Sequence, residues 1–209
     1  MKTTLLFSGG LDSATVLFKL RAEGHEVKCL AINYGQRHRR ELRAAADITE
    51  ALGVELEVGV ISGFWNQTAL TGGADLPVGE DAANIVPNRN MVFLSLAMAH
   101  AIDHGSEAVA WGPNSDDFGT FPDCHEVFAA SMRSAMGLAH THTIGLLTPL
   151  MKMTKAEVVV EALRLGVPVG ATWSCYEGGR KPCRKCGACV SRSRALVLAD
   201  VSEGGSEGR

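Results

Sequence analysis

A short glycine- and serine-rich loop is the first place in the chain where the residue types suggest chemistry. Residues 8–13 read Ser-Gly-Gly-Leu-Asp-Ser, and they lie between an apolar segment that predicts a buried strand and a segment that predicts a helix. Two glycines let the backbone turn sharply and approach an anion closely. The N–H groups at the start of the helix would point at that anion, and the helix dipole favours its negative charge. The loop therefore predicts a phosphate site, and Asp12 suits it if Mg²⁺ lies between carboxylate and phosphate.

The spacing of this loop matches neither the Walker pattern nor the dinucleotide-binding pattern. An ordinary glycine-rich turn is the alternative, but the whole hexapeptide resembles the pyrophosphate loop of the ATP pyrophosphatase superfamily. Enzymes of that superfamily cleave ATP between the α and β phosphates and attach AMP to a carbonyl or carboxylate oxygen. The resemblance implies that ATP is bound by Phe7, Ser8, Gly9, Gly10, Leu11, Asp12, Ser13, Ala14, Thr15, Val16 and Leu17.

Four of the six cysteines gather near the C-terminal part of the sequence. They follow the pattern Cys175-x7-Cys183-x2-Cys186-x2-Cys189. Four thiolates at this spacing suit a closed, tetrahedral, structural zinc site, and the basic residues around them would offset its negative charge. An iron–sulfur cluster and a redox-active Cys-x-x-Cys pair are the alternatives, ranked second and third.

Single polar residues in the loops between the predicted elements are weaker candidates. Arg37 follows the second strand and could hold adenine or an anionic group, or simply be a solvated residue at a helix start. Arg89 could bind a carboxylate through both guanidinium nitrogens. Asp117 and the nearby Asp123 could offer a carboxylate to a heterocycle, although an ordinary turn explains them equally well. Lys155 could meet a phosphate, or be a capped, exposed lysine.

The elements that must position these residues alternate along the chain. The sequence predicts strands at residues 3–7, 27–33, 55–61, 108–111 and 143–147. It predicts helices at residues 13–23, 39–52, 90–104, 123–138 and 155–166, with a short last helix ending near residue 199 and an irregular flap at 62–88. This alternation predicts an α/β fold with a doubly wound, mainly parallel five-stranded sheet, followed by the four-cysteine zinc segment. The loops after the first, second and fourth strands then share the ligand-binding edge.

These motifs together resemble the 7-cyano-7-deazaguanine synthase family, also called QueC. The matching pieces occur in order from Phe7 to about Arg192, which is nearly the whole chain. They are Phe7 to Ser13, Tyr34 to Arg39, Val86 to Asn90, Asp117-Phe118, Pro122-Asp123-Cys124, Thr148-Pro149-Leu150, Lys155-Ala156-Glu157, and Ser174-Cys175-Tyr176 with the three later cysteines.

The resemblance implies an ATP-dependent ligase that converts 7-carboxy-7-deazaguanine and ammonia into 7-cyano-7-deazaguanine through an amide. It implies Mg²⁺ with the nucleotide and Zn²⁺ at the four cysteines, and it implies a homodimer. Asp12, Ser13 and Lys155 would be the catalytic residues. The residues implied to contact the substrate are Arg37, Arg89, Asp117 and Asp123.

The chain differs from the pattern common in that family at three places. Asn88 stands where many members have glycine, and His125 stands where many have arginine. The third difference is Gly119-Thr120-Phe121, where Ser-Gly-Tyr is common. Two further functions therefore stay open: a related enzyme that processes a deazaguanine for nucleic-acid or protein modification, and a tRNA-thiolating enzyme of the same superfamily.

The composition is that of an ordinary globular protein. The 209 residues are 46% hydrophobic and 21% charged, with a net charge of −3 that gives no strong signal of nucleic-acid binding. We expect an ATP-binding domain at residues 1–170, a zinc-binding segment at 171–200 and a disordered tail at 201–209. No signal peptide or membrane-spanning segment is recognisable, so the sequence predicts a cytoplasmic protein without a membrane partner.

Overall fold

The fold is a five-stranded parallel sheet between layers of helices. The structure is a computed structural model, and it describes residues 1–37, 39–65, 68–71 and 85–200. All neighbouring strands are parallel, in the order β3-β2-β1-β4-β5, which confirms the expected doubly wound sheet. The strands are β1 (Lys2–Leu6), β2 (Glu26–Asn33), β3 (Leu56–Val60), β4 (Ala108–Ala110) and β5 (Gly145–Leu147).

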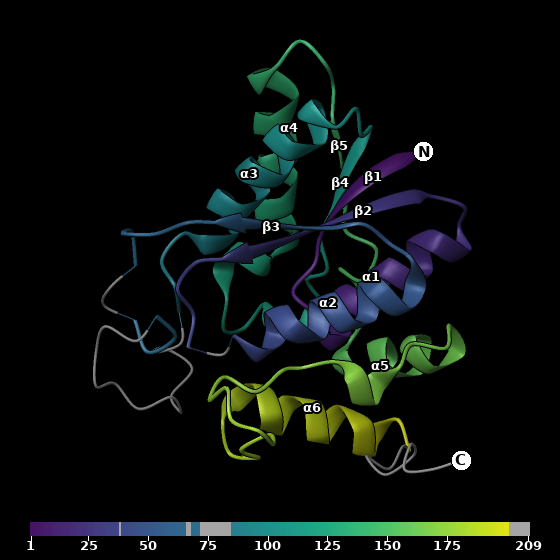
Figure 1. The fold of residues 1–209 in the computed structure, drawn as a ribbon, viewed down its shortest axis with the longest axis vertical. Helices are drawn as coiled ribbons and strands as arrows, with labels where there is room; N and C mark the ends of the chain where they lie inside the picture. The colour runs from purple at the N-terminus through teal and green to yellow at the C-terminus, as the bar shows by residue number, and fades with distance from the viewer. Residues whose placement is uncertain (38, 66–67, 72–84, 201–209) are drawn as a thin grey trace.

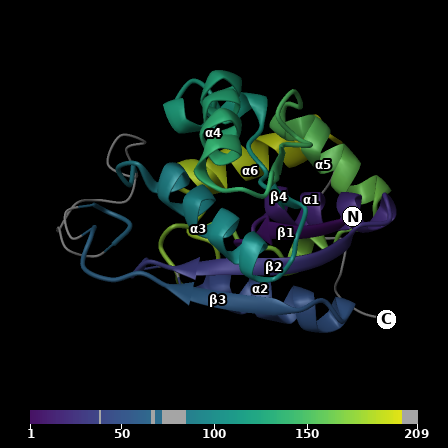
Figure 2. The same cartoon turned by 90° about the horizontal axis from the view of Figure 1, so that it is seen from above.

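The helices form layers on both faces of this sheet. They are α1 (Leu11–Ala22), α2 (Arg40–Leu52), α3 (Arg89–Asp103), α4 (Glu126–Ala139), α5 (Lys155–Arg164) and α6 (Gly187–Leu198). Helices α3 and α4 cover one face, α1 and α2 cover the other, and α5 and α6 form a further layer beyond α1 and α2 (Figure 1). Seen from above, β2 and β3 run along the side of the molecule away from α4 and α5 (Figure 2). No helix within the described part of the chain could cross a lipid bilayer.

Successive residues of each strand supply two separate hydrophobic cores, because strand side chains point alternately to the two faces of a sheet. In β2, Cys29 packs with the core that contains α1 and α5, whereas Leu30 packs with the core beneath α3 and α4. In β4, Ala110 and Val109 divide in the same way. Burial on both faces explains why the strands read as short apolar runs in the sequence.

The order of the strands reverses between β1 and β4, which makes their carboxyl ends the expected ligand-binding crevice. Beyond the end of β1, Phe7 N–H donates to the Leu30 carbonyl at 2.9 Å. Beyond the end of β4, Trp111 N–H donates to the Leu147 carbonyl at 3.0 Å. These bonds extend the sheet to the points where the 8–13 loop and the loop at Gly112 begin.

Several boundaries differ from the sequence prediction for local reasons. Helix α1 begins at Leu11, two residues earlier than expected, because Gly10 takes an extended conformation and serves as its N-cap. The helix expected from residue 123 is divided into a 3₁₀ turn, Pro122–Cys124, and α4. Extended His125 separates them and accepts the Val127 N–H at 3.2 Å through Nδ1. The predicted tail at 201–209 and most of the flap lie outside the described residues.

Gly9 places the loop directly against α2. Its φ of +75° lies in the left-handed region that favours glycine. A Cβ at this position would lie 2.5 Å from the Ala45 nitrogen and 2.6 Å from the Glu41 carbonyl oxygen. Two independent constraints, conformation and space, therefore require glycine here.

Replacing Gly9 by alanine should destabilise the fold by about 3 kcal/mol, because left-handed strain and a backbone clash add together. Gly24→Ala is the matched control, since Gly24 has φ +81° but nothing within 4 Å of an added Cβ. Strain alone should cost that variant about 1 kcal/mol. Urea unfolding of both variants measures the difference, and equal losses would contradict the packing argument.

Candidate functional site

A cavity of about 1090 Å³ opens at the carboxyl ends of β1 and β4. Ligand pockets usually occupy about 300–1,000 Å³, so the space suits a nucleotide together with a second small molecule. Its polar lining comes from several stretches that are far apart in the sequence. These residues include Ser8, Asp12, Ser13, Arg89, Asn90, Asp116, Asp117, Lys155, Ser174 and Arg194.

The first turn of α1 offers an anion site to this cavity. No side chain of the described residues caps α1 at its N-terminus, so backbone N–H groups of its first turn stay available. The Gly10 N–H and the Ser13 hydroxyl both lie 3.2 Å from the Ser8 hydroxyl. The Ser13 hydroxyl also donates to the Gly10 carbonyl at 3.1 Å. The loop thus places two hydroxyls and a positive helix end around one point, as a phosphate requires.

Asp12 has one paired and one unpaired carboxylate oxygen. Its Oδ2 accepts a short hydrogen bond from Lys155 Nζ, which comes from the start of α5. Its Oδ1 is buried and has no hydrogen-bond partner among the described residues. A buried oxygen without a partner is costly, and a hard cation such as Mg²⁺ would satisfy it. The residues present therefore fit a magnesium ion beside the phosphate loop.

Asp116 and Asp117 lie in a 3₁₀ turn, Ser115–Asp117, that brings two more carboxylates to Lys155 and Asp12. Asp116 Oδ2 accepts the backbone N–H of Lys155 at 3.1 Å, which fixes the start of α5. Asp117 Oδ2 accepts the Asn114 side-chain amide at 2.8 Å. Burial, and secondly the negative charge of Asp12, raise the pKa of Asp117 to about 6. The turn therefore holds a carboxylate that gains and loses its proton near neutral pH.

Arg89 supplies positive charge on the opposite wall. Its guanidinium donates to the Tyr34 hydroxyl at 3.4 Å and lies 6.0 Å from the centre of that ring. Burial raises the pKa of Tyr34 to about 12, so this phenol stays neutral. Asn88, immediately before Arg89, has φ +59°. Asparagine tolerates this left-handed conformation better than most residues, so it can occupy this position in place of glycine.

The other residues proposed from the sequence lie in three different settings. Arg37 is exposed and outside the cavity lining, and its N–H donates to the Leu70 carbonyl at 2.8 Å. Asp123 also lies outside the lining and accepts the Asn90 N–H at 3.4 Å. The buried residues of α1 after Ser13, namely Ala14, Thr15, Val16 and Leu17, do not line the cavity. Residues 7–13 line it except Gly9.

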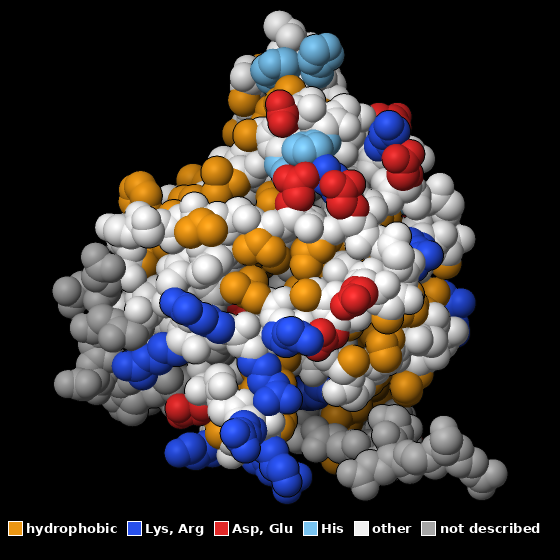
Figure 3. Space-filling view, in the orientation of Figure 1, with side chains coloured by type: hydrophobic (Ala, Val, Ile, Leu, Met, Phe, Trp, Pro, Cys, Tyr) orange, Lys and Arg blue, Asp and Glu red, His pale blue; other side chains and the backbone are white. Residues whose placement is uncertain are grey.

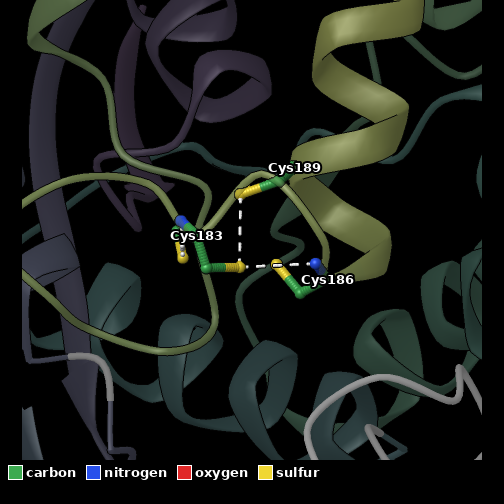
Figure 4. Close-up of side chains that lie close together, drawn as sticks. Cys183, Cys186 and Cys189 are labelled. Carbon is green, nitrogen blue, oxygen red and sulfur yellow. Dashed lines mark hydrogen bonds between the residues drawn. The ribbon is translucent and has the colours of Figure 1, made fainter.

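The four cysteines converge although they span two structural elements. Cys186 is the N-cap of α6 and Cys189 lies in its first turn, whereas Cys175 and Cys183 come from the preceding segment. The side chains of Cys183, Cys186 and Cys189 point toward one another (Figure 4). All four sulfurs lie within 4.8 Å of each other, and those of Cys183 and Cys189 are 3.9 Å apart.

This spacing fits a single metal ion. Four sulfurs at about 2.3 Å from one zinc ion in a tetrahedron lie about 3.8 Å from each other. A cluster of several irons would hold its ligand sulfurs farther apart. Burial opposes a thiolate at Cys183, but the Lys185 and Cys186 N–H groups outweigh it and lower the pKa of Cys183 to about 7. The cysteines therefore form a metal-binding group with one thiol already inclined to ionise.

Trp173 connects this metal-binding group to the 8–13 loop, and sequence reasoning missed it. Its backbone N–H donates to the Gly9 carbonyl at 3.0 Å, and its indole N–H donates to the Cys175 carbonyl at 2.9 Å. The guanidinium of Arg40 lies 4.5 Å from the centre of its ring. The one signal in the sequence was a tryptophan two residues before the first cysteine of the cluster.

Comparisons with known proteins agree on one family. The family model described as "Queuosine biosynthesis protein QueC" matches residues 2–200. The 7-cyano-7-deazaguanine synthase of Marinobacter nauticus is 38% identical over 207 residues, which cover 95% of this chain and 94% of the relative. The synthase of Archaeoglobus fulgidus is 37% identical over 97% of this chain and 89% of its own.

Solved structures show the same fold at much lower identity. The U34-tRNA thiolase NcsA of Methanococcus maripaludis, solved with its [4Fe-4S] cluster, aligns with a TM-score of 0.55 and 18% identity. That alignment covers 96% of this chain and 65% of the thiolase. NMN synthetase of Francisella tularensis gives a TM-score of 0.55 at 15% identity, over 95% and 83% of the two chains.

The raised pKa of Asp117 makes a prediction about stability and pH. The carboxyl titrates at about 6 in the folded chain, against 3.8 when free. Its ionisation therefore costs the folded state free energy as pH rises from about 4 to 6, and the cost persists above pH 6. The free energy of unfolding of Asp117→Asn should exceed that of wild type by about 3 kcal/mol at pH 7, and the two should be nearly equal near pH 4. Urea unfolding at both pH values tests this, and a gain independent of pH would contradict it.

Removing one cysteine ligand should release the metal. Cys186→Ser should lose bound metal and unfold at a lower temperature, because a closed site contributes to folding directly. Cys29→Ala is the control, since Cys29 is buried in β2 and lies outside the cluster. Elemental analysis and thermal unfolding measure both effects. Full metal content in Cys186→Ser would show that the cysteines do not hold it.

Proposed function

The chain belongs to the QueC family, and we propose that it is a 7-cyano-7-deazaguanine synthase, a carbon–nitrogen ligase that consumes ATP. Its substrates are 7-carboxy-7-deazaguanine and ammonia. The observation that carries the proposal is the uncapped first turn of α1, next to an Asp12 oxygen that lacks a partner among the described residues. In a member of this family, that arrangement is a seat for the phosphates of ATP and their cation.

The reaction activates the same carbon twice. A carboxylate oxygen of the substrate attacks the α phosphorus of ATP, pyrophosphate leaves, and an acyl adenylate forms. Ammonia then adds to the carbonyl carbon, AMP leaves with the carboxylate oxygen, and an amide results. The amide oxygen is adenylated by a second ATP. Loss of AMP with the two nitrogen-bound protons then leaves the nitrile, so each nitrile consumes two ATP.

Different residues around the loop bind the phosphates, hold the cation and balance the charge. The N–H groups of α1 and the hydroxyls of Ser8 and Ser13 bind the phosphates that leave as pyrophosphate. Asp12 would hold Mg²⁺ through its unpaired Oδ1, and the bound ion would supply positive charge to the leaving group. Lys155 orients Asp12 and lies close enough to the loop to balance phosphate charge.

The substrate occupies the other part of the cavity. Arg89 pairs with its carboxylate, and Asp117 accepts hydrogen bonds from the N–H groups of its ring system. Both residues line the cavity. Arg37 and Asp123 also contact the substrate in this proposal, although neither lines the cavity. Asp123 is the nearer of the two in sequence to the Asp117 turn, and its bond to the Asn90 backbone holds it at the start of α3.

The metal in the four-cysteine group is zinc, and its function is structural. Four cysteine ligands close the coordination sphere, which leaves no position for substrate. The nitrogen donor is ammonia, and the active form is a homodimer. The exposed apolar side chains at the end of α6, Val197 and Leu198, offer surface for contact with a second copy.

The two alternative functions receive less support than synthesis of the nitrile. The likeness to the tRNA thiolase is one of fold, at 18% identity. His125, which raised the question of a different deazaguanine enzyme, caps α4 and lies outside the cavity lining. The family's arginine at that position is therefore replaced without altering the lining.

A product assay tests the proposal directly. The protein is incubated with ATP, Mg²⁺, ammonium and 7-carboxy-7-deazaguanine, and nitrile, AMP and pyrophosphate are measured. We expect two AMP for each nitrile. Asp12→Asn should lower kcat/KM by about 100-fold or more, because the cation loses its charged ligand. Asp47→Asn is the control, since Asp47 is exposed on α2 and pairs with Arg43. Untouched ATP with every deazaguanine acid tried would overturn the proposal.

A further inference from the structure

A second group of possible metal ligands lies outside the cavity lining, where the end of α3 meets β3. Glu57 stands near the start of β3, His100 lies in the last turn of α3, and His104 is the C-cap of that helix. One ligand atom of each lies within 4.8 Å of the other two. In the face drawn in Figure 3, a histidine side chain adjoins acidic and basic side chains above the middle of the view.

The distances in this group match a tetrahedral ion. His100 Nε2 is 3.2 Å from Glu57 Oε2, and His104 Nε2 is 3.1 Å from Glu57 Oε1. Ligands bound at about 2.0–2.1 Å to one zinc ion lie about 3.3 Å from each other. Small shifts of these side chains would therefore place an ion between them.

The outer nitrogens of both histidines are already oriented. His104 Nδ1 lies 2.9 Å from the His100 carbonyl, which can only accept, so Nδ1 carries the proton. His100 Nδ1 lies 3.2 Å from the Thr4 hydroxyl, which is itself 3.0 Å from the Ser106 hydroxyl. Metal-binding histidines characteristically donate their second N–H to such a carbonyl or hydroxyl. Both Nε2 atoms are thereby directed at Glu57.

His104 Nε2 faces Glu57 Oε1 at 3.1 Å, and the two imidazole rings are stacked with their centroids 4.1 Å apart. A cation held beside Glu57 would contact the Nε2 atoms of both rings and supply the positive charge that the carboxylate attracts. The surrounding groups are acidic on balance. Lys28 Nζ lies 2.5 Å from Glu57 and 3.0 Å from Glu55, and Asp103 lies 3.9 Å from His104. Three carboxylates against one ammonium leave two negative charges, which one divalent cation would neutralise.

We propose that Glu57, His100 and His104 bind a divalent transition-metal ion, with zinc preferred, at a site separate from the four cysteines. Two imidazoles and one carboxylate suit zinc and leave a coordination position for water. The His104 and Glu57 side chains are 27% and 40% exposed, so an ion can enter from solvent. The site joins the end of α3 to the edge strand β3, far from the phosphate loop, and its role is to stabilise that contact.

Counting bound metal separates this site from the cysteines. The purified full-length protein is treated with a mild chelator, which removes metal from an open site before a closed one. It is then dialysed against micromolar ZnCl₂, and metal per chain is measured. We expect wild type to gain one equivalent beyond the metal held by the cysteines, and its thermal midpoint to rise with it. With CoCl₂, the added ion should show weak visible bands without thiolate charge transfer.

Single substitutions identify the ligands. His104→Gln should weaken binding of the added zinc ion by about 100-fold or more. Loss of a ligand costs at least as much affinity as loss of the outer-shell partner of a ligand. Thr4→Val keeps the shape of the buried side chain and removes the hydroxyl beside His100, so about 10-fold weakening is expected. The double variant His140→Gln/His142→Gln is the control. Those two rings also lie close, with centroids 5.2 Å apart, but no carboxylate joins them in a candidate metal group among the described residues.

Two results would overturn the proposal. Wild type could take up no metal beyond the cysteine group, in which case the cluster is a network of hydrogen bonds and ion pairs alone. The added equivalent could instead disappear in the His140/His142 variant and persist in His104→Gln, which would place it elsewhere. Because zinc content and thermal unfolding need neither ATP nor a deazaguanine, these results are independent of the proposed enzymatic function.

Discussion

The uncapped N-terminus of α1 is the constraint around which the rest of the active site is organised. A helix start normally satisfies its free N–H groups with a side chain or water. Here the helix begins at the point where the sheet reverses its strand order, and Gly10 provides no side chain. An anion is the natural partner for such a helix end. Gly9 and Trp173 hold the loop so that this end remains open to the cavity.

The carboxylates near that helix end carry negative charge, which repels a phosphate. Asp12 and Asp117 are close enough for the charge of one to raise the pKa of the other. Lys155 offsets part of this charge through its contact with Asp12. In the proposed function, a cation that arrives with the nucleotide would balance the remainder. Such a charge distribution favours a metal–nucleotide complex over the nucleotide alone.

The sequence allowed the sheet, the phosphate loop and the cysteine group to be predicted because each is encoded locally. Alternating apolar runs specify parallel strands, and the spacing of the four cysteines specifies their convergence. Contacts between distant segments could not be read in this way. The bond of Asp116 to Lys155 and that of Trp173 to Gly9 each join separate elements. The same is true of Glu57 with His100 and His104, although two histidines four residues apart on one helix were a local signal that was missed.

Trp173 has a consequence for how such a protein can change over evolution. Its backbone holds the Gly9 carbonyl while its indole holds the Cys175 carbonyl, so one residue supports both the loop and the cysteine segment. Without that segment, the loop would lose the hydrogen bond that Trp173 donates to the Gly9 carbonyl. Changes in the loop and in the cysteine segment are therefore coupled in this chain, because a shift of either one reaches the other through Trp173.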